Sequence, residues 1–141
     1  MLFRSWKAEN VMAPTFTTAL NLHAAWIGFL LGCISGAVLG LFFHQSDWLG
    51  GYGSWRRRML RLGHISFFGI GFINLGFGLT FRVLRLPAPT AASTFLIVAA
   101  VSMPAVCFLA AAREWFRNFF FVPVISLIAA VSIVVGRLVS L

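Results

Sequence analysis

The residues best suited to chemistry are two histidines that flank the first polar loop of the chain. His44 follows Gly40 by four residues at the end of one apolar run, and His64 stands just before the next run. Two antiparallel helices joined by this loop would bring both imidazoles to the same membrane face. Because imidazole is the commonest metal ligand in proteins, the pair is a candidate site for haem b, another metal or a quinone, with Arg57 and Arg61 as cations for haem propionates. A simpler interpretation makes both histidines interfacial residues at the ends of two helices.

The rest of the chain carries little that points to catalysis or coupled transport. Its three acidic residues, Glu9, Asp47 and Glu114, lie outside the long apolar runs, and no P-loop, HExxH or CxxC motif is present. An enzyme is therefore not favoured. Transporters driven by protons or cations usually place a carboxylate among their spans, so a small transporter is only a second alternative.

Four long apolar runs must position the histidines, and they occupy residues 24–43, 65–81, 91–112 and 119–136. The hydrocarbon core of a bilayer is about 30 Å thick and is crossed by about 17–25 helical residues. Inside it, backbone polar groups must be satisfied within the helix itself. With 60% hydrophobic and 10% charged residues, the chain is predicted to be all-α. It forms a single integral membrane domain, a four-span bundle with antiparallel up-down connections, preceded by a tail at residues 1–19.

Glycines recur at helical spacing in the first two runs. The first run carries one at every fourth position, namely Gly28, Gly32, Gly36 and Gly40. Small residues at this spacing let another helix approach closely, so this stripe is predicted to be a helix-packing face. The second run has Gly71 and Gly78 seven residues apart, with Asn74 between them on the same seam. Asn74 is expected to hydrogen-bond across a helix interface, with a direct ligand role as the alternative.

The net charge of +8 sits beside the apolar runs rather than on a soluble module. This placement predicts contact with anionic lipid and argues against nucleic-acid binding. Four arginines cluster before the second run, at positions 56, 57, 58 and 61. Because positive residues near span ends favour the cytoplasmic side, the 44–63 loop is predicted to be cytoplasmic in an inner membrane. Cys33 and Cys107 lie at different depths of parallel spans and are expected to remain unbridged.

One histidine lies near the start of the glycine-rich first run, and another opens the second. This arrangement resembles small four-helix membrane cytochromes and single-subunit relatives of haem–copper oxidases. The resemblance covers the first two spans, rests on histidine and glycine placement, and carries over no site residues. The sequence favours an accessory or interaction subunit that packs through its glycine stripe against its own second span, a partner protein or another copy of itself. A haem b-binding electron-transfer subunit using His44 and His64 is the alternative.

Overall fold

A computed structural model describes residues 16–141 of the chain, and all regular structure in this part is helical. The elements in chain order are α2 (Phe16–Leu41), η1 (Trp48–Gly50), α3 (Trp55–Val83), α4 (Thr90–Ala112), η2 (Glu114–Phe120) and α5 (Phe121–Val139). Four helices are long and apolar enough to cross a membrane. The predicted four-span, all-α fold with antiparallel connections is therefore confirmed. Most of the predicted tail lies outside the described residues.

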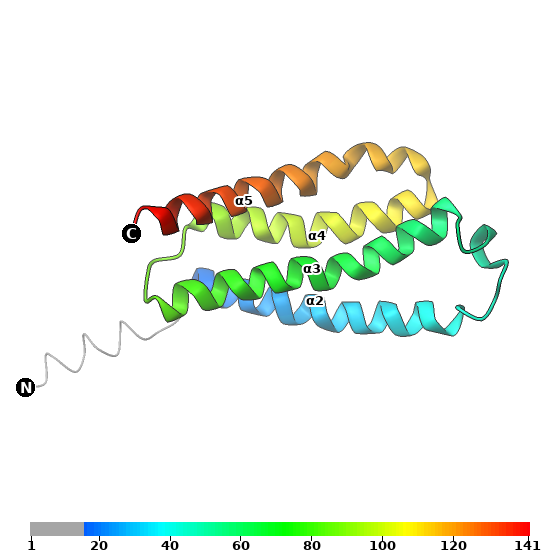
Figure 1. The fold of residues 1–141 in the computed structure, drawn as a ribbon, viewed down its shortest axis with the longest axis horizontal. Helices are drawn as coiled ribbons and strands as arrows, with labels where there is room; N and C mark the ends of the chain where they lie inside the picture. Colours follow the sequence, from blue (N-terminus) through cyan, green and yellow to red (C-terminus); the bar gives the residue numbers. More distant parts are fainter. Residues whose placement is uncertain (1–15) are drawn as a thin grey trace, which may run out of the picture.

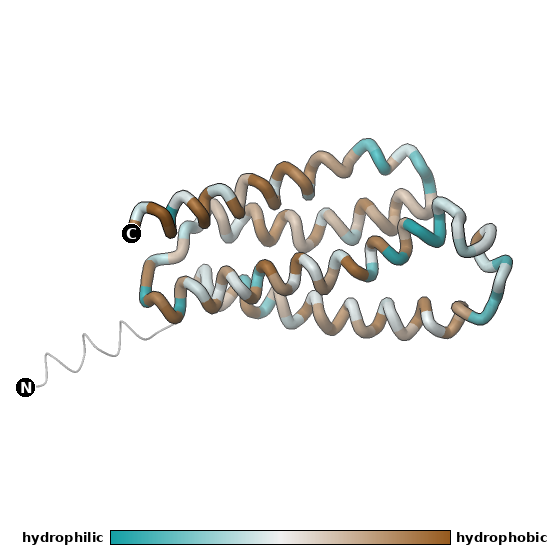
Figure 2. Tube along the Cα trace, viewed as in Figure 1, coloured by the Kyte–Doolittle hydropathy of each residue, from teal (hydrophilic) through white to brown (hydrophobic). Residues whose placement is uncertain are grey.

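The four long helices lie in a row that follows the chain order, and each runs antiparallel to its predecessor (Figure 1). Every long helix packs mainly against its neighbours in the sequence, and α2 also contacts α4. Hydrophilic segments gather at the two ends of the row, most densely around the 42–54 loop and η2 (Figure 2). We call this end the loop end and the opposite one, where α5 finishes, the terminal end.

The exposed surface of the row is apolar, as expected for a protein solvated by lipid. Trp26 and Ile27 are 66% and 57% exposed on α2, and Ile128 on α5 is 62% exposed. Soluble monomers rarely expose large continuous apolar surfaces. A hydrophobic core cluster lies at the terminal end, where Phe77 and Phe81 of α3 pack with residues of α4 and α5.

Two helices begin earlier than the apolar runs suggested. α3 begins at Trp55, ten residues before the predicted start of the second span. Ser54 causes this extension because its side chain accepts the backbone N–H of Arg57 and caps the helix. α2 already includes Phe16 and therefore contains Asn21, which hydropathy had left near the predicted tail. Both extensions change the depth at which functional side chains lie.

Candidate functional site

Three of the four glycines on α2 face α3, and we call Gly28, Gly32 and Gly36 the glycine seam. A Cβ added at Gly36 would lie 2.6 Å from the His64 ring, and one at Gly28 would lie 3.2 Å from the backbone oxygen of Phe67. At Gly40 the same atom would meet nothing within 4 Å. The seam is thus occupied inside the chain by α3.

The α3 side of this interface also relies on small residues. A Cβ at Gly71 would come within 2.7 Å of the Phe29 ring, and one at Gly78 within 2.8 Å of the Leu22 side chain. Larger residues at these positions would therefore displace side chains of α2. The two helices approach closely because each presents glycine where the other presents bulk.

His64 lies inside α3 and contacts α2. Its Nδ1 is 3.1 Å from the hydroxyl of Ser35, and that hydroxyl donates to the carbonyl of Gly32 at 3.0 Å. A serine has one hydroxyl hydrogen, so while that hydrogen is donated to Gly32, the bond between Ser35 and His64 requires the tautomer with the proton on Nδ1. The imidazole is a packing and hydrogen-bonding element of the α2–α3 interface.

His44 lies in the turn that follows α2 and is exposed. It is eight positions beyond Gly36, the residue against which His64 packs. The histidines therefore occupy different levels of the bundle, because the early start of α3 places His64 well inside the helix. Among residues 16–141, no three His, Cys, Asp or Glu side chains come together as a metal site. Haem ligation by His44 and His64 stays a prediction, which an absorption spectrum of the purified protein tests.

Arg57 is buried under the 42–54 loop, with 3% of its surface exposed. Its guanidinium donates to three backbone carbonyls, those of Phe43, Gln45 and Ser46, at 3.3–3.4 Å. It also lies over three aromatic rings, those of Phe43, Trp48 and Tyr52. These contacts satisfy backbone carbonyls of the loop that follows α2, so Arg57 holds the loop in place.

Arg61 continues the same arrangement one turn further along α3. Its guanidinium carbon lies 4.2 Å from the centroid of Tyr52, and one nitrogen donates to the Tyr52 carbonyl at 3.2 Å. Both arginines proposed from the sequence as propionate ligands are thus engaged with the loop. The neighbouring Arg56 and Arg58 are exposed, and within residues 16–141 neither side chain has a hydrogen-bond or ion-pair partner.

A buried polar cluster joins three helices near the terminal end, and we call Asn21, Asn74 and Ser93 the polar triad. The side-chain amide of Asn21 donates to Asn74 at 2.7 Å, while its oxygen accepts from the Ser93 hydroxyl at 2.5 Å. Asn74 also donates to the carbonyl of Ile70 at 3.0 Å. The sequence indicated a partner for Asn74 but identified neither Asn21 nor Ser93. The signal available for Asn21 was its position, because its amide side chain lies three residues before the apolar run 24–43.

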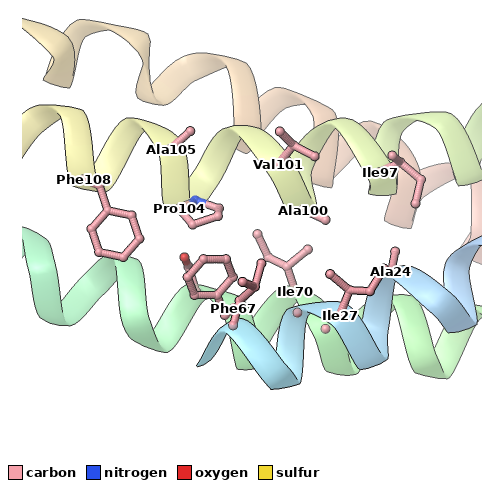
Figure 3. A pocket seen from close by; sticks show the side chains of 14 residues that line it. Ala24, Ile27, Phe67, Ile70, Ile97, Ala100, Val101, Pro104, Ala105 and Phe108 are labelled. Carbon is pink, nitrogen blue, oxygen red and sulfur yellow. The ribbon is translucent and has the colours of Figure 1, made fainter. Parts of the chain in front are cut away.

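A groove of about 430 Å³ lies between α2, α3 and α4. Ala100, Pro104 and Phe108 of α4 face Phe67 and Ile70 of α3 across it (Figure 3). Its volume falls within the range of about 300–1,000 Å³ typical of small-molecule sites. All three helices contribute residues near their midpoints, so the groove lies at mid-span. The sequence did not reveal it, because its walls come from three separate segments.

Small and apolar residues shape the groove. Gly28 and Gly71 lie where α2 and α3 meet, and Ala100 lies on α4 one turn before Pro104. Proline has no N–H, so the carbonyl of Ala100 lacks its usual intrahelical donor. The hydroxyl of Ser66 is already used by the carbonyl of Gly63 at 2.7 Å. This lining offers volume and apolar contact rather than acid–base or nucleophilic chemistry.

The polar triad joins α2, α3 and α4 about one helical turn away from the groove. Asn21 precedes the lining residue Ala24 by three positions, and Ser93 precedes the lining residue Ile97 by four. Neither histidine of the predicted pair lines the groove. No known protein family, curated protein or solved structure matches this chain.

Proposed function

We propose that this protein is a small accessory protein of a cell membrane that acts by binding rather than by catalysis. Its groove between α2, α3 and α4 receives an apolar chain of a molecule dissolved in the bilayer. The observation that carries the proposal is the apolar groove of about 430 Å³ at mid-span. A molecule in the bilayer reaches this depth without crossing a polar surface.

The glycine seam is occupied by α3, which favours the groove rather than the seam as the binding site. Gly28, Gly32 and Gly36 are packed against α3, so an external helix finds no free surface there. Gly28 additionally contributes to the groove wall. The seam therefore keeps α2 and α3 close, and the groove lies between this pair and α4.

The location and orientation of the protein are part of the proposal. Four membrane-crossing helices place the loop end and the terminal end on opposite sides of a membrane. We place the loop end, with its arginines at 56, 57, 58 and 61, in the cytoplasm of a cell with a bacterial-type inner membrane. Partner membrane proteins or further copies of the chain would contact the outer faces of the row.

Photocrosslinking tests the binding proposal in liposomes. The probe is a phosphatidylcholine that carries a diazirine at the end of one acyl chain, which reaches the bilayer midplane. We expect crosslinks at the groove segments 66–71 and 97–108 to exceed those at the lipid-facing residues of α5. Ala100→Phe should fill the groove and reduce its crosslinking, with Ala100→Leu as a milder second variant.

Ala112→Phe is the matched control, since Ala112 is exposed at the end of the same helix and does not line the groove. It should leave the crosslinking pattern unchanged. Uniform labelling of all lipid-facing helices, insensitive to both substitutions at Ala100, would show that the groove holds no chain and would overturn the proposal. Far-ultraviolet circular dichroism of each variant verifies that the helices are intact.

A further inference from the structure

The arginines at the loop end fall into two groups that the structure separates. Arg57 and Arg61 are committed to the carbonyls and aromatic rings of the 42–54 loop. Arg56 and Arg58 are exposed, and their side chains make no hydrogen bond or ion pair with any described residue. Guanidinium groups bind phosphate with paired, charge-assisted hydrogen bonds. Two cations are therefore available to an anion at the membrane face.

Arg56 and Arg58 lie on opposite faces of α3, and these faces differ in their relation to the groove. Arg56 precedes the groove residue Phe67 by 11 positions, which is about three full turns. Arg58 precedes Phe67 by 9 positions, about two and a half turns, and so heads the opposite helix face. Only Arg56 is in register with the groove wall.

The distance along the helix matches one leaflet of a bilayer. Eleven residues at about 1.5 Å each place Arg56 roughly 16 Å from Phe67 along the helix axis. Half of the hydrocarbon core is about 15 Å thick. A phosphate at Arg56 therefore stands at headgroup depth when the end of its own acyl chain reaches the groove.

We propose that the occupant of the groove is one acyl chain of an anionic phospholipid whose phosphate is bound by Arg56. This inference rests on the proposed function and names the molecule that the groove holds. The charge of Arg56 makes the site selective for an anionic headgroup, while the groove supplies the apolar contact. The protein then carries one tightly held anionic lipid in addition to its ordinary lipid shell.

Native mass spectrometry of the purified protein tests this inference. The protein is exchanged into micelles that contain phosphatidylglycerol and phosphatidylcholine in equal amounts and with identical chains. We expect the wild type to retain one phosphatidylglycerol roughly fivefold over phosphatidylcholine, the preference that one cation near the surface provides. Arg56→Gln should abolish this preference, whereas the matched control Arg58→Gln should keep it. Ala100→Phe should lose both lipids.

The outcomes distinguish this inference from the proposed function. Equal retention of the two lipids by the wild type, with loss of both in Ala100→Phe, would leave groove binding intact and reject the anionic headgroup. An equal effect of Arg56→Gln and Arg58→Gln would reject a defined phosphate site in favour of general surface charge. Lipid retention that is unchanged in Ala100→Phe and in Ala100→Leu would reject the groove itself, and this inference with it.

Discussion

At the residue scale, seven polar or charged residues are buried in the described part of the chain, and three of them form the polar triad. Asn21 has the central role because it donates to Asn74 and accepts from Ser93. It joins α2 to both α3 and α4, whereas each partner makes a single bond to it. A hydrogen bond between membrane helices contributes about 0.6 kcal/mol on average and up to about 1.7 kcal/mol.

Substitutions in the triad should follow this connectivity. Asn21→Ala removes two interhelical hydrogen bonds and is expected to lower the free energy of unfolding by about 1–2 kcal/mol, while Ser93→Ala lowers it by about 0.6 kcal/mol. Unfolding by titration with a denaturing detergent measures both. Asn118→Ala, at an exposed position in η2, is the control. Equal losses for Asn21→Ala and Ser93→Ala would show that the hydrogen bond from Asn21 to Asn74 contributes nothing to stability.

Arg57 illustrates how a buried charge is stabilised here without a carboxylate. Its partners are three backbone carbonyls and three aromatic faces, and none of the described acidic residues forms an ion pair with it. A planar guanidinium satisfies several carbonyls at once and stacks on rings, which an ammonium group does less well. The geometry therefore demands arginine rather than any positive residue.

Arg57→Lys should loosen the 42–54 loop although it keeps the charge. We expect faster amide hydrogen exchange across residues 43–54, while the exchange of the helix interiors stays unchanged. Arg58→Lys, made at an exposed arginine of the same helix turn, should exchange like the wild type. If Arg57→Lys also exchanges like the wild type, the three carbonyl contacts are not what orders the loop.

At the scale of the element, α2 has one face of small residues and one of large ones. The glycine seam meets α3, and a Cβ at Gly28 would press on backbone that cannot rotate away. Near Gly36 the nearest atoms belong to the His64 side chain, which has rotamer freedom. How well each glycine of the seam tolerates replacement by a larger residue should thus depend on whether the atoms facing it belong to the backbone or to a side chain.

A leucine series along α2 measures this difference. Gly28→Leu is expected to lower the free energy of unfolding by about 1–3 kcal/mol, the usual range for overpacking. Gly36→Leu should be destabilising but less so, since His64 can move. Gly40→Leu is the matched control and should be neutral or slightly stabilising, because it meets nothing within 4 Å and glycine is a poor helix former. A destabilising Gly40→Leu would mean that this end of α2 is packed against something in the membrane.

At the scale of the whole molecule, the helices form a row rather than a closed square, with α2 and α5 at its edges (Figure 1). A row leaves grooves between its members, and the groove at mid-span is lined by α2, α3 and α4. Lipid solvates the remaining surface, where large apolar side chains are exposed. The same row determines which ends of the helices share a membrane face.

The topology is tested by labelling single cysteines in intact cells. In a variant in which Cys33 and Cys107, both free thiols, are replaced by alanine, Ser46→Cys probes the loop end and Ser140→Cys the terminal end. A membrane-impermeant maleimide should label Ser140→Cys from outside and Ser46→Cys only after the membrane is opened. Labelling of both positions from one side would contradict an arrangement with four crossings, and the reversed pattern would contradict only the proposed orientation.

Much of the architecture could be predicted from hydropathy, because bilayer thickness sets the span length and local composition shows which segments are apolar over that length. The apolar runs predicted the four helices, although the first nine residues of α3, at positions 55–63 and rich in arginine, were assigned to the loop. Helix capping by Ser54 decided that boundary, and hydropathy does not register capping. The error placed His64 at the start of its helix rather than inside it.

Four helices able to cross a membrane follow from the apolar runs, because a bilayer is crossed by about 17–25 consecutive apolar helical residues. The free cysteines follow from their different depths in two of these helices. The tertiary structure alone decided that the glycine seam faces α3, that Asn74 pairs with Asn21 and that Arg57 holds a loop. It alone produced the groove, whose walls are separated by up to 84 positions, from Ala24 to Phe108. Such a site depends on how three helices pack against one another, and no local run of residues determines that packing.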